Sequence, residues 1–486
     1  MRDKRKLKLC VKALLFFTPF IVGSIGYLKS GEGLSQSLYS AIGLYLLDFY
    51  GEECNRLLEF ARWTAPVMSA SGIFLILKSL AQRTRDFILC LFGKATAIYC
   101  EDEVRQILGE NIKNSVIGSK ENVHAGVKDN IIMLSDDMES LNFYYTNQKK
   151  FENSNVYLRL EQIDSFLLKE NRIKFFNETE LIARNYWKEH NLLKYLHDDS
   201  MNIKIAIIGF EQLGQKLLSF GLMNNIYARN QKIEYHVWGD SSAYENVFSQ
   251  IDFMNGDFVT YHGDDWSKDL NSLGEFDRVI VTQENQLELV QALLYICMNA
   301  EIDYYNKGEA MLENIFAGSR LRAFGAQANI LTEKNIMSEE LCRFGMELNY
   351  AYYKQYAKEN VDVEQKETVM KELWESLDGF TKASNIASAD YHEIRLMILD
   401  LLGKQNDDFS EDEKKWLSKA EHIRWSRFHL LNHWTYQPEE NGQTKNKEKR
   451  THSCLIPYEE LSEKEKEKDW GSVLTLMSLK NLNRYQ

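Results

Sequence analysis

Proline and cysteine are scarce in this chain of 486 residues. Only four prolines occur, which favours long helices and tight turns over a loop-rich fold. The seven cysteines lack C-x-x-C spacing. Cys100, Cys297 and Cys342 have apolar sequence neighbours. This indicates reduced thiols in a protein core, in a cytosolic compartment.

Motifs of catalysis and metal binding are also missing. The sequence has no P-loop, no nucleophile beside a base and no carboxylate pair with definable roles, so we expect no enzymatic activity. A zinc site is the alternative for His422, His429, His433 and Cys454, because His429 and His433 share a helical i, i+4 face. No carboxylate or second cysteine completes that set, so we expect no metal.

Most of the chain has no excess of basic over acidic side chains. The net charge is −13, whereas residues 1–94 carry 13 basic and 7 acidic side chains. The remainder is therefore strongly anionic. Because phosphate binding needs a basic face, we do not expect nucleic acid as a partner.

Long hydrophobic runs occur only near the start of the chain, at residues 13–28, 33–47 and 63–77. Each is shorter than the ~20 residues that span a bilayer upright. The flanking Lys and Arg residues can lay their aliphatic stems along the apolar layer and keep their charges in water, which makes the first and third runs long enough to span it. We therefore predict a membrane region over residues 1–93, with two spanning helices and a re-entrant or interfacial helix between them. A cleaved signal peptide and three true spans are the alternatives.

The charges around these runs predict the topology. Lys and Arg precede the first run and follow the third, so both flanks are expected on the cytoplasmic side of a cell inner membrane. The large C-terminal part would then be cytoplasmic too. Asp48, Glu52 and Glu53 lie on the opposite side, where they would form the negative mouth of a pore.

Residues 94–200 alternate short β-rich runs with helical stretches, which indicates βαβ units on a parallel sheet. No glycine-rich turn follows the first strand. We therefore predict a degenerate Rossmann-like domain here.

Residues 201–358 repeat the pattern with a stronger signal. A buried strand at 203–208 is followed by Gly209-Phe-Glu-Gln-Leu-Gly214, which is G-x-G-x-x-G with Glu211 as the middle residue. The outer glycines allow the tight turn and close helix packing, whereas Glu211 puts a negative charge where a pyrophosphate would sit. Asp240, Asp264 and Thr282 follow later strands. We therefore predict a Rossmann domain. The alternative for the whole domain is a scaffold that binds no nucleotide, and the alternative for Asp240 is a role only as a helix N-cap.

The two units resemble the regulator-of-potassium-conductance domains, a Trk-type NAD-binding fold that hangs beneath many prokaryotic ion channels and transporters. The resemblance covers about residues 95–357 and rests on Gly209, Gly214, Asp240, and Asp264 with Thr282. It implies a bound nucleotide such as NAD. Potassium selectivity is not implied, because the run at 33–47 has no T-V-G-Y-G filter.

A helical linker is predicted over 359–415, followed by a small helical module over 416–486. This module carries Ala420-Glu-His-Ile-Arg-Trp425 and Arg450-Thr-His-Ser-Cys-Leu-Ile-Pro-Tyr458. It closely resembles the repeat domain of ryanodine receptors, whose pattern K-T-H-P-C-L-V-P-Y is changed here at Arg450 and Ser453.

The side chains of this module suit a flat anionic ligand. Its aromatic rings offer stacking faces, its arginines offer forked donors, and two histidines would titrate near neutral pH. The alternative is that the aromatics form a core and the charges a solvated rim. The predicted ligand residues are His422, Arg424, Trp425, Trp434, Tyr436, Arg450, Thr451, His452 and Tyr458.

Together these features predict a ligand-gated membrane effector. A cytosolic nucleotide (NAD, an ADP-ribose-like molecule or a cyclic nucleotide) would bind the Rossmann pair or the C-terminal module and shift the membrane helices toward an ion-conducting state. Two spans per chain require a homo-oligomer for a pore. Proteins that resemble this one are bacterial, and several membrane proteins with sensing domains act in phage defence, so anti-phage defence is the expected context. The alternatives are a non-conducting, membrane-tethered regulator of a transporter and an NAD-consuming enzyme.

Overall fold

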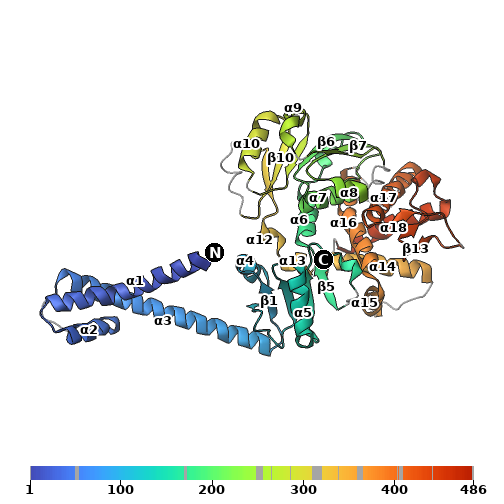
Figure 1. The fold of residues 1–486 in the computed structure, drawn as a ribbon. Coiled ribbons are helices and arrows are strands. Elements are labelled where there is room, and N and C mark those ends of the chain that lie inside the picture. Colours follow the sequence, from blue (N-terminus) through green and yellow to red (C-terminus); the bar gives the residue numbers. More distant parts are fainter. Residues whose placement is uncertain are drawn as a thin grey trace. The chain divides into compact units, whose positions relative to one another are not determined.

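The structure is a computed structural model that divides into two compact units, Met1–Ala95 and Thr96–Gln486 (Figure 1). Each unit is described by itself. The described residues are 2–49, 54–168, 172–247, 255–263, 265–284, 286–308, 320–337, 339–357, 365–401, 403, 409–440 and 442–483.

The first unit is helical. It consists of α1 (Arg2–Lys29), α2 (Leu34–Gly43), the 3-10 helix η1 (Leu44–Leu46) and α3 (Arg56–Leu91). Close packing of α1 against its neighbours depends on two glycines. A Cβ atom at Gly23 would lie 2.9 Å from Leu44 Cδ1, and one at Gly26 would lie 2.8 Å from Leu58 Cγ. Asn55 caps α3 and donates its side-chain amide to the Gly26 carbonyl at 2.8 Å, which ties the two long helices together.

The outer faces of α1 and α3 are apolar, with Phe17 55%, Trp63 71% and Ile76 69% exposed. By length and composition, α3 alone among the helices of the described residues can cross a membrane, and the apolar stretch Leu14–Lys29 of α1 is shorter. The middle run forms α2 and η1, as a short helix between the long ones. The structure thus shows no clear two-span hairpin, and that topology stays a prediction.

The second unit begins with a parallel five-stranded sheet in the order β2-β1-β3-β4-β5. This is the flavodoxin-like order 2-1-3-4-5. The predicted βαβ alternation over 94–200 is confirmed as a parallel α/β sheet. Its elements are β1 (Thr96–Cys100), α4 (Asp102–Asn111), β2 (Ser115–Ile117), β3 (Asp129–Met133), α5 (Asp137–Phe151), β4 (Asn155–Arg159), η2 (Ser165–Leu167), β5 (Ile173–Phe176), α6 (Glu178–Glu189) and η3 (Leu193–Tyr195).

A second parallel sheet has six strands in the order β8-β7-β6-β9-β10-β11. Numbered from β6, this is 3-2-1-4-5-6, the order of dinucleotide-binding folds. The predicted Rossmann-like sheet is therefore confirmed. Its elements are β6 (Ser200–Ile208), α7 (Gln212–Asn224), β7 (Asn230–Trp238), α8 (Ser242–Val247), β8 (Phe258–His262), η5 (Trp266–Asp269), α9 (Leu270–Leu273), β9 (Arg278–Val281), α10 (Leu287–Ile296), β10 (Glu301–Tyr305) and β11 (Leu321–Phe324).

The rest of the second unit is mainly helical. It comprises α12 (Gln327–Ile330), α13 (Glu333–Met337), α14 (Glu339–Ala357), α15 (Lys366–Ser376), α16 (Gly379–Leu401), α17 (Glu411–Leu431), η7 (Tyr458–Glu460) and α18 (Glu463–Asn483). A small sheet in the order β12-β14-β13 lies in the loop between α17 and α18. Its strands are β12 (Thr435–Tyr436), β13 (Lys445–Asn446) and β14 (Thr451–His452).

One hydrophobic core extends from the first sheet through the second sheet to the C-terminal helices. Trp187 on α6 donates its indole N–H to the Leu217 carbonyl of α7 at 2.8 Å. Tyr391 on α16 donates its hydroxyl to the Ile226 carbonyl at 2.8 Å, just beyond α7. Helix α7 is therefore the element on which α6, α16 and α17 converge. The finer domain limits at 200, 358 and 415 stay predictions.

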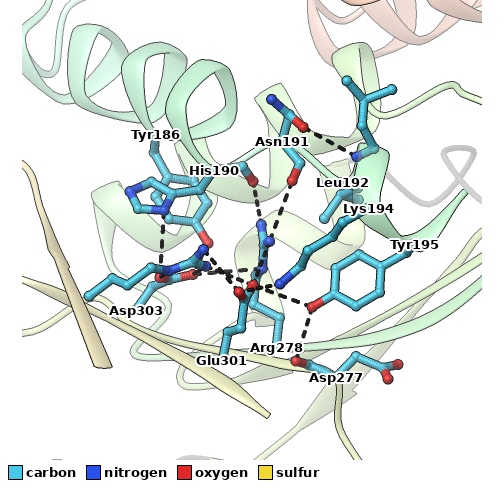
Figure 2. A network of polar contacts seen from close by, with 12 residues as sticks. Tyr186, His190, Asn191, Leu192, Lys194, Tyr195, Asp277, Arg278, Glu301 and Asp303 are labelled. Carbon is cyan, nitrogen blue, oxygen red and sulfur yellow. Dashed lines mark hydrogen bonds and ion pairs between the residues drawn. The ribbon is translucent and has the colours of Figure 1, made fainter. Parts of the chain in front are cut away.

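A buried ionic network joins the segment after α6 to the amino ends of β9 and β10 (Figure 2). Arg278 is fully buried and donates to Glu301 at 2.9 Å and to the backbone carbonyls of His190 and Asn191. Asp303, also fully buried, accepts from the Tyr186 hydroxyl at 2.7 Å. Figure 2 shows these side chains converging from α6 and from the sheet strands. The network therefore fixes the connection between the two sheets.

Candidate functional site

The glycine turn after β6 has the geometry that its sequence predicts. Gly209 has φ +95°, and a Cβ there would lie 2.5 Å from Thr282 Oγ1. A Cβ at Gly214 would clash with the Gly209 carbonyl oxygen. Thr282 donates its hydroxyl to that same oxygen at 2.6 Å. Gly209, Gly214 and Thr282 thus lie together where β6 and β9 are neighbours, which is the switch point of this strand order.

Two predicted carboxylates lie beside this turn. Glu211 is the N-cap residue of α7, where it is exposed and makes no side-chain cap hydrogen bond. Asp240 is exposed and accepts from the Ser242 hydroxyl at 2.6 Å and from its N–H at 3.3 Å. These hydrogen bonds lower the pKa of Asp240, so it is ionised at neutral pH. Asp240 thus contacts the first residue of α8, which begins at Ser242 and not at Ser241, so neither role predicted for Asp240 is established. Asp264 lies outside the described residues.

The turn is closed on one side by an aromatic group. Phe210 is buried, and its ring lies 5.1 Å from that of Tyr244 and 6.2 Å from that of Tyr261. Gly239, with φ +142°, approaches so closely that a Cβ there would lie 2.6 Å from the Phe210 nitrogen. A ligand at this turn would therefore meet backbone, Thr282 and carboxylates. Carboxylates accept hydrogen bonds from ribose hydroxyls and repel a pyrophosphate.

The corresponding edge of the first sheet is filled by the chain itself. The Asp137 carboxylate accepts the backbone N–H groups of Glu161, Gln162 and Ile163 at 2.8–2.9 Å. Glu161 in turn accepts from the Glu178 N–H at 2.7 Å and the Thr179 hydroxyl at 2.7 Å. Burial raises the pKa of Glu161. The backbone N–H donors of this edge are therefore already bonded to two carboxylates, which leaves few donors for an anionic nucleotide.

Several predicted ligand residues of the C-terminal module form an aromatic and histidine cluster. The Trp425 ring lies 4.0 Å from the His429 ring and 4.8 Å from the His452 ring. Trp434, 5% exposed, stacks on Phe380 at 5.1 Å. Burial lowers the pKa of His429 to about 3 and that of His452 to about 4. The prediction that His452 titrates near neutral pH is therefore wrong, because desolvation keeps it neutral.

Arg424 lies in the interior and not at a ligand surface. It is 2% exposed and donates to Glu421 at 2.8 Å, and Arg395 donates to the same carboxylate at 2.7 Å. Burial acts to raise the pKa of Glu421, but the two guanidinium groups outweigh it and lower that pKa. Arg424 is therefore part of a buried ion pair, which does not fit its predicted role of donating hydrogen bonds to a ligand phosphate.

The remaining predicted residues shape the loop between α17 and α18. Arg450 has φ +51° and donates to the Asn432 carbonyl at 3.1 Å. Thr451 and His452 form β14, and Tyr458 is buried. His422 contacts the Ile456 carbonyl at 2.9 Å and Asp469 at 3.4 Å. Tyr436 alone among the predicted aromatic ligands is largely exposed, at 49%.

The predicted pore mouth is described only in part. Asp48 follows η1, and its N–H donates to the Gly43 carbonyl at 2.9 Å. Glu52 and Glu53 lie outside the described residues, so the structure does not test the ring of carboxylates.

Sequence reasoning missed a cavity of about 540 Å³ in the second unit. Its walls come from α6, the end of α7, α12–α13, α14 and α16, and include Asn185, Asn224 and Asn329. Residues from 181 to 397 contribute to it. No local motif could reveal it, because only the tertiary fold brings these segments together.

Comparison with known proteins shows a distant likeness of fold. No family model matches the chain, and no curated protein matches its sequence. The A chain of dipicolinate synthase from Bacillus subtilis is 11% identical, over 52% of this chain and 96% of that chain, with a TM-score of 0.23. L-tryptophan dehydrogenase from Nostoc punctiforme is 11% identical, over 63% and 88%, with a TM-score of 0.23. The NAD complexed form of D-isomer specific 2-hydroxyacid dehydrogenase from Lactobacillus delbrueckii ssp. bulgaricus is 11% identical, over 64% and 98%, with a TM-score of 0.20.

At these scores the likeness says nothing about ligand or reaction. The parallel α/β fold instead rests on the strand pairing and strand order of the two sheets. The resemblances to regulator-of-potassium-conductance domains and to the ryanodine-receptor repeat stay predictions. What the structure establishes is a chain with two parallel Rossmann-like sheets and helical regions.

Proposed function

We propose that this protein is a nucleotide-sensing membrane effector, in which ligand binding to the second unit gates the helices of the first. The observation that carries the proposal is the glycine turn at the switch point of a sheet ordered 3-2-1-4-5-6. The same chain carries two long helices with apolar outer faces. The proposed ligand is NAD, an ADP-ribose-like molecule or a cyclic nucleotide.

The membrane part of the proposal is supported by the packing of the first unit. Its helices meet through small residues such as Gly23, Gly26 and Ala61, as helices in a bilayer commonly do. Large apolar side chains cover the outside, which is the distribution that lipid favours. Only residues 92–95 separate α3 from β1, so a change in the second unit would reach α3 through a short connection. The inner membrane, a homo-oligomeric pore and a role in anti-phage defence are parts of this proposal.

The nucleotide part is supported by Gly209 and Gly214, which have no side chains in the turn, and by Thr282, whose hydroxyl holds the Gly209 carbonyl. Glu211 and Asp240 favour a ligand that presents hydroxyl groups to them over one that presents a pyrophosphate. With this charge pattern, we expect a cyclic nucleotide, or the ribose edge of a nucleotide, to bind at this turn more tightly than an extended dinucleotide.

The test is ligand binding and ion flux with the full-length protein in liposomes. We expect a nucleotide of the proposed classes to bind and to start ion flux, and Gly209→Asp to abolish both. The new side chain would clash at φ +95° and add a carboxylate. Gly109→Asp is the matched control, since a Cβ there meets nothing nearer than 3.9 Å. If Gly209→Asp binds and conducts like Gly109→Asp, the turn is not the sensor, and Arg450→Ala then tests the C-terminal module.

A non-conducting, membrane-tethered regulator is the second candidate. It is favoured by the finding that one helix among the described residues, α3, is long and apolar enough to cross a bilayer. One span anchors a chain but does not by itself form a conducting hairpin. Nucleotide binding without ion flux in the liposome experiment would support this candidate. Loss of NAD during prolonged incubation would instead support the enzyme alternative.

A further inference from the structure

We propose that the cavity between α6, α13 and α16 binds a nucleoside-class ligand at a site separate from the glycine turn after β6. This inference does not depend on the proposed function, because the two sites share no residue. The cavity has a volume of about 540 Å³, which lies within the ~300–1,000 Å³ range of ligand pockets.

Carboxamide groups are the first support. Asn224 is only 5% exposed, lines the cavity and has no side-chain hydrogen bond among the residues that the structure describes. Asn185, which is half-buried, and Asn329, which is exposed, also line the cavity and add amide groups to its polar side. An amide that faces a cavity can be satisfied by water or by a ligand that donates and accepts hydrogen bonds. Asn335, by contrast, donates to the Ile330 carbonyl at 2.9 Å.

Balanced charges form one wall. Arg184 on α6 pairs with Asp390 on α16 at 2.7 Å, and Lys188 pairs with Glu393 at 2.6 Å. The Arg184 contact uses Nε, and the terminal N–H groups of the guanidinium are further donors at this wall. The two pairs carry no net charge together, and Lys334 adds one cation to the lining of the cavity. This wall fits sugar hydroxyls or a single phosphate better than a highly charged ligand.

An apolar surface completes the site. Phe344 is half-buried, and it lines the cavity together with Ile394 and Met397. A flat ring can stack on Phe344 while its polar edge meets the carboxamides, which both donate and accept. A free sugar would leave the apolar side without a partner, and a lipid chain would leave the amides unpaired. A nucleobase joined to a sugar satisfies both sides.

The cavity also lies where three sections of the second unit meet. Helix α6 follows the first sheet, α12–α13 follow the second sheet, and α16 belongs to the C-terminal helices. A ligand here would contact all three sections, as their neighbouring positions in Figure 1 illustrate. Binding would thus favour the arrangement in which they are packed together.

The test measures binding of adenosine and guanosine to the full-length protein in detergent by calorimetry, with adenosine monophosphate and ribose as further probes. We expect saturable nucleoside binding, weakened roughly tenfold or more by Asn224→Leu, because leucine cannot form a hydrogen bond with the ligand. Asn153→Leu, at an exposed position outside the cavity, should leave the affinity unchanged. Gly209→Asp should also leave it unchanged, which separates this site from the glycine turn.

Photolabelling of the unmodified protein with 8-azidoadenosine keeps the inference testable if Asn224→Leu does not fold. We expect label in peptides that contain residues 181–191, 329–335 or 390–397. Label confined to residues 209–214, binding of ribose alone, or no saturable binding of any nucleoside would overturn the inference. Equal affinities of Asn224→Leu and Asn153→Leu would do the same.

Discussion

Replacement of Arg278 by methionine should destabilise the second unit strongly. Arg278 is fully buried and donates to Glu301 at 2.9 Å and to the carbonyls of His190 and Asn191. Methionine keeps much of the volume but removes every donor. Removing one partner of a buried ion pair typically costs about 3–5 kcal/mol. We expect the lower end, because Arg322 still contacts Glu301 at 2.9 Å.

The measurement is urea unfolding of the full-length protein in detergent, followed by tryptophan fluorescence. Trp187 lies on α6, close to the network, and reports on this part of the core. With a slope of about 3 kcal/mol per molar, a loss of about 3 kcal/mol lowers the midpoint by about 1 M.

Arg229→Met is the matched control for this experiment. Arg229 pairs with Asp199 at 3.0 Å, but the two side chains are 40% and 37% exposed. Exposed pairs contribute only about 0–1 kcal/mol. If the midpoints of Arg278→Met and Arg229→Met fall together, the buried network does not stabilise the connection between the sheets, and the reasoning fails.

Three further perturbations follow from the structure. Gly214→Ala should lower the melting temperature because its Cβ would clash with the Gly209 carbonyl, whereas Gly109→Ala, inside α4, should raise stability by up to about 1 kcal/mol. Acidification from pH 7 to about pH 5 should destabilise the C-terminal helices by about 2 kcal/mol through His429, whose pKa of about 3 lies below its unfolded value; His429→Leu should remove that part of the pH dependence of unfolding. Asn55→Ala should cost about 1 kcal/mol and speed amide exchange at the start of α3; unchanged exchange would exclude the cap.

The regular elements of the sheets were predictable because they depend on local pattern. The buried run that became β6 and the turn from Gly209 to Gly214 carry their structure in neighbouring residues. The parallel sheets follow from the alternation of strands and helices. Glu211 at the N-terminus of α7 was predictable for the same reason.

Features that depend on distant residues were not predictable. The flavodoxin-like order of the first sheet is a property of strand pairing, which no short motif encodes. Arg424 looks like a surface cation in the sequence, but it lies in the interior, where it shares the Glu421 carboxylate with Arg395. Asn224 and Asn185 become neighbours of one cavity only when α6 and α7 pack together.

The packing of the C-terminal helices also changes how sensing would work. Arg427 on α17 is buried and donates to Asp257, ahead of β8, at 2.9 Å and to the Leu222 carbonyl of α7 at 2.7 Å. Arg184 and Lys188 join α6 to α16 in the same core. A ligand at the turn before α7 and one in the cavity beside α6 would therefore act on a single packed body, not on separate modules. Any coupling between them must appear reciprocally, so that each ligand changes the affinity of the other by the same factor.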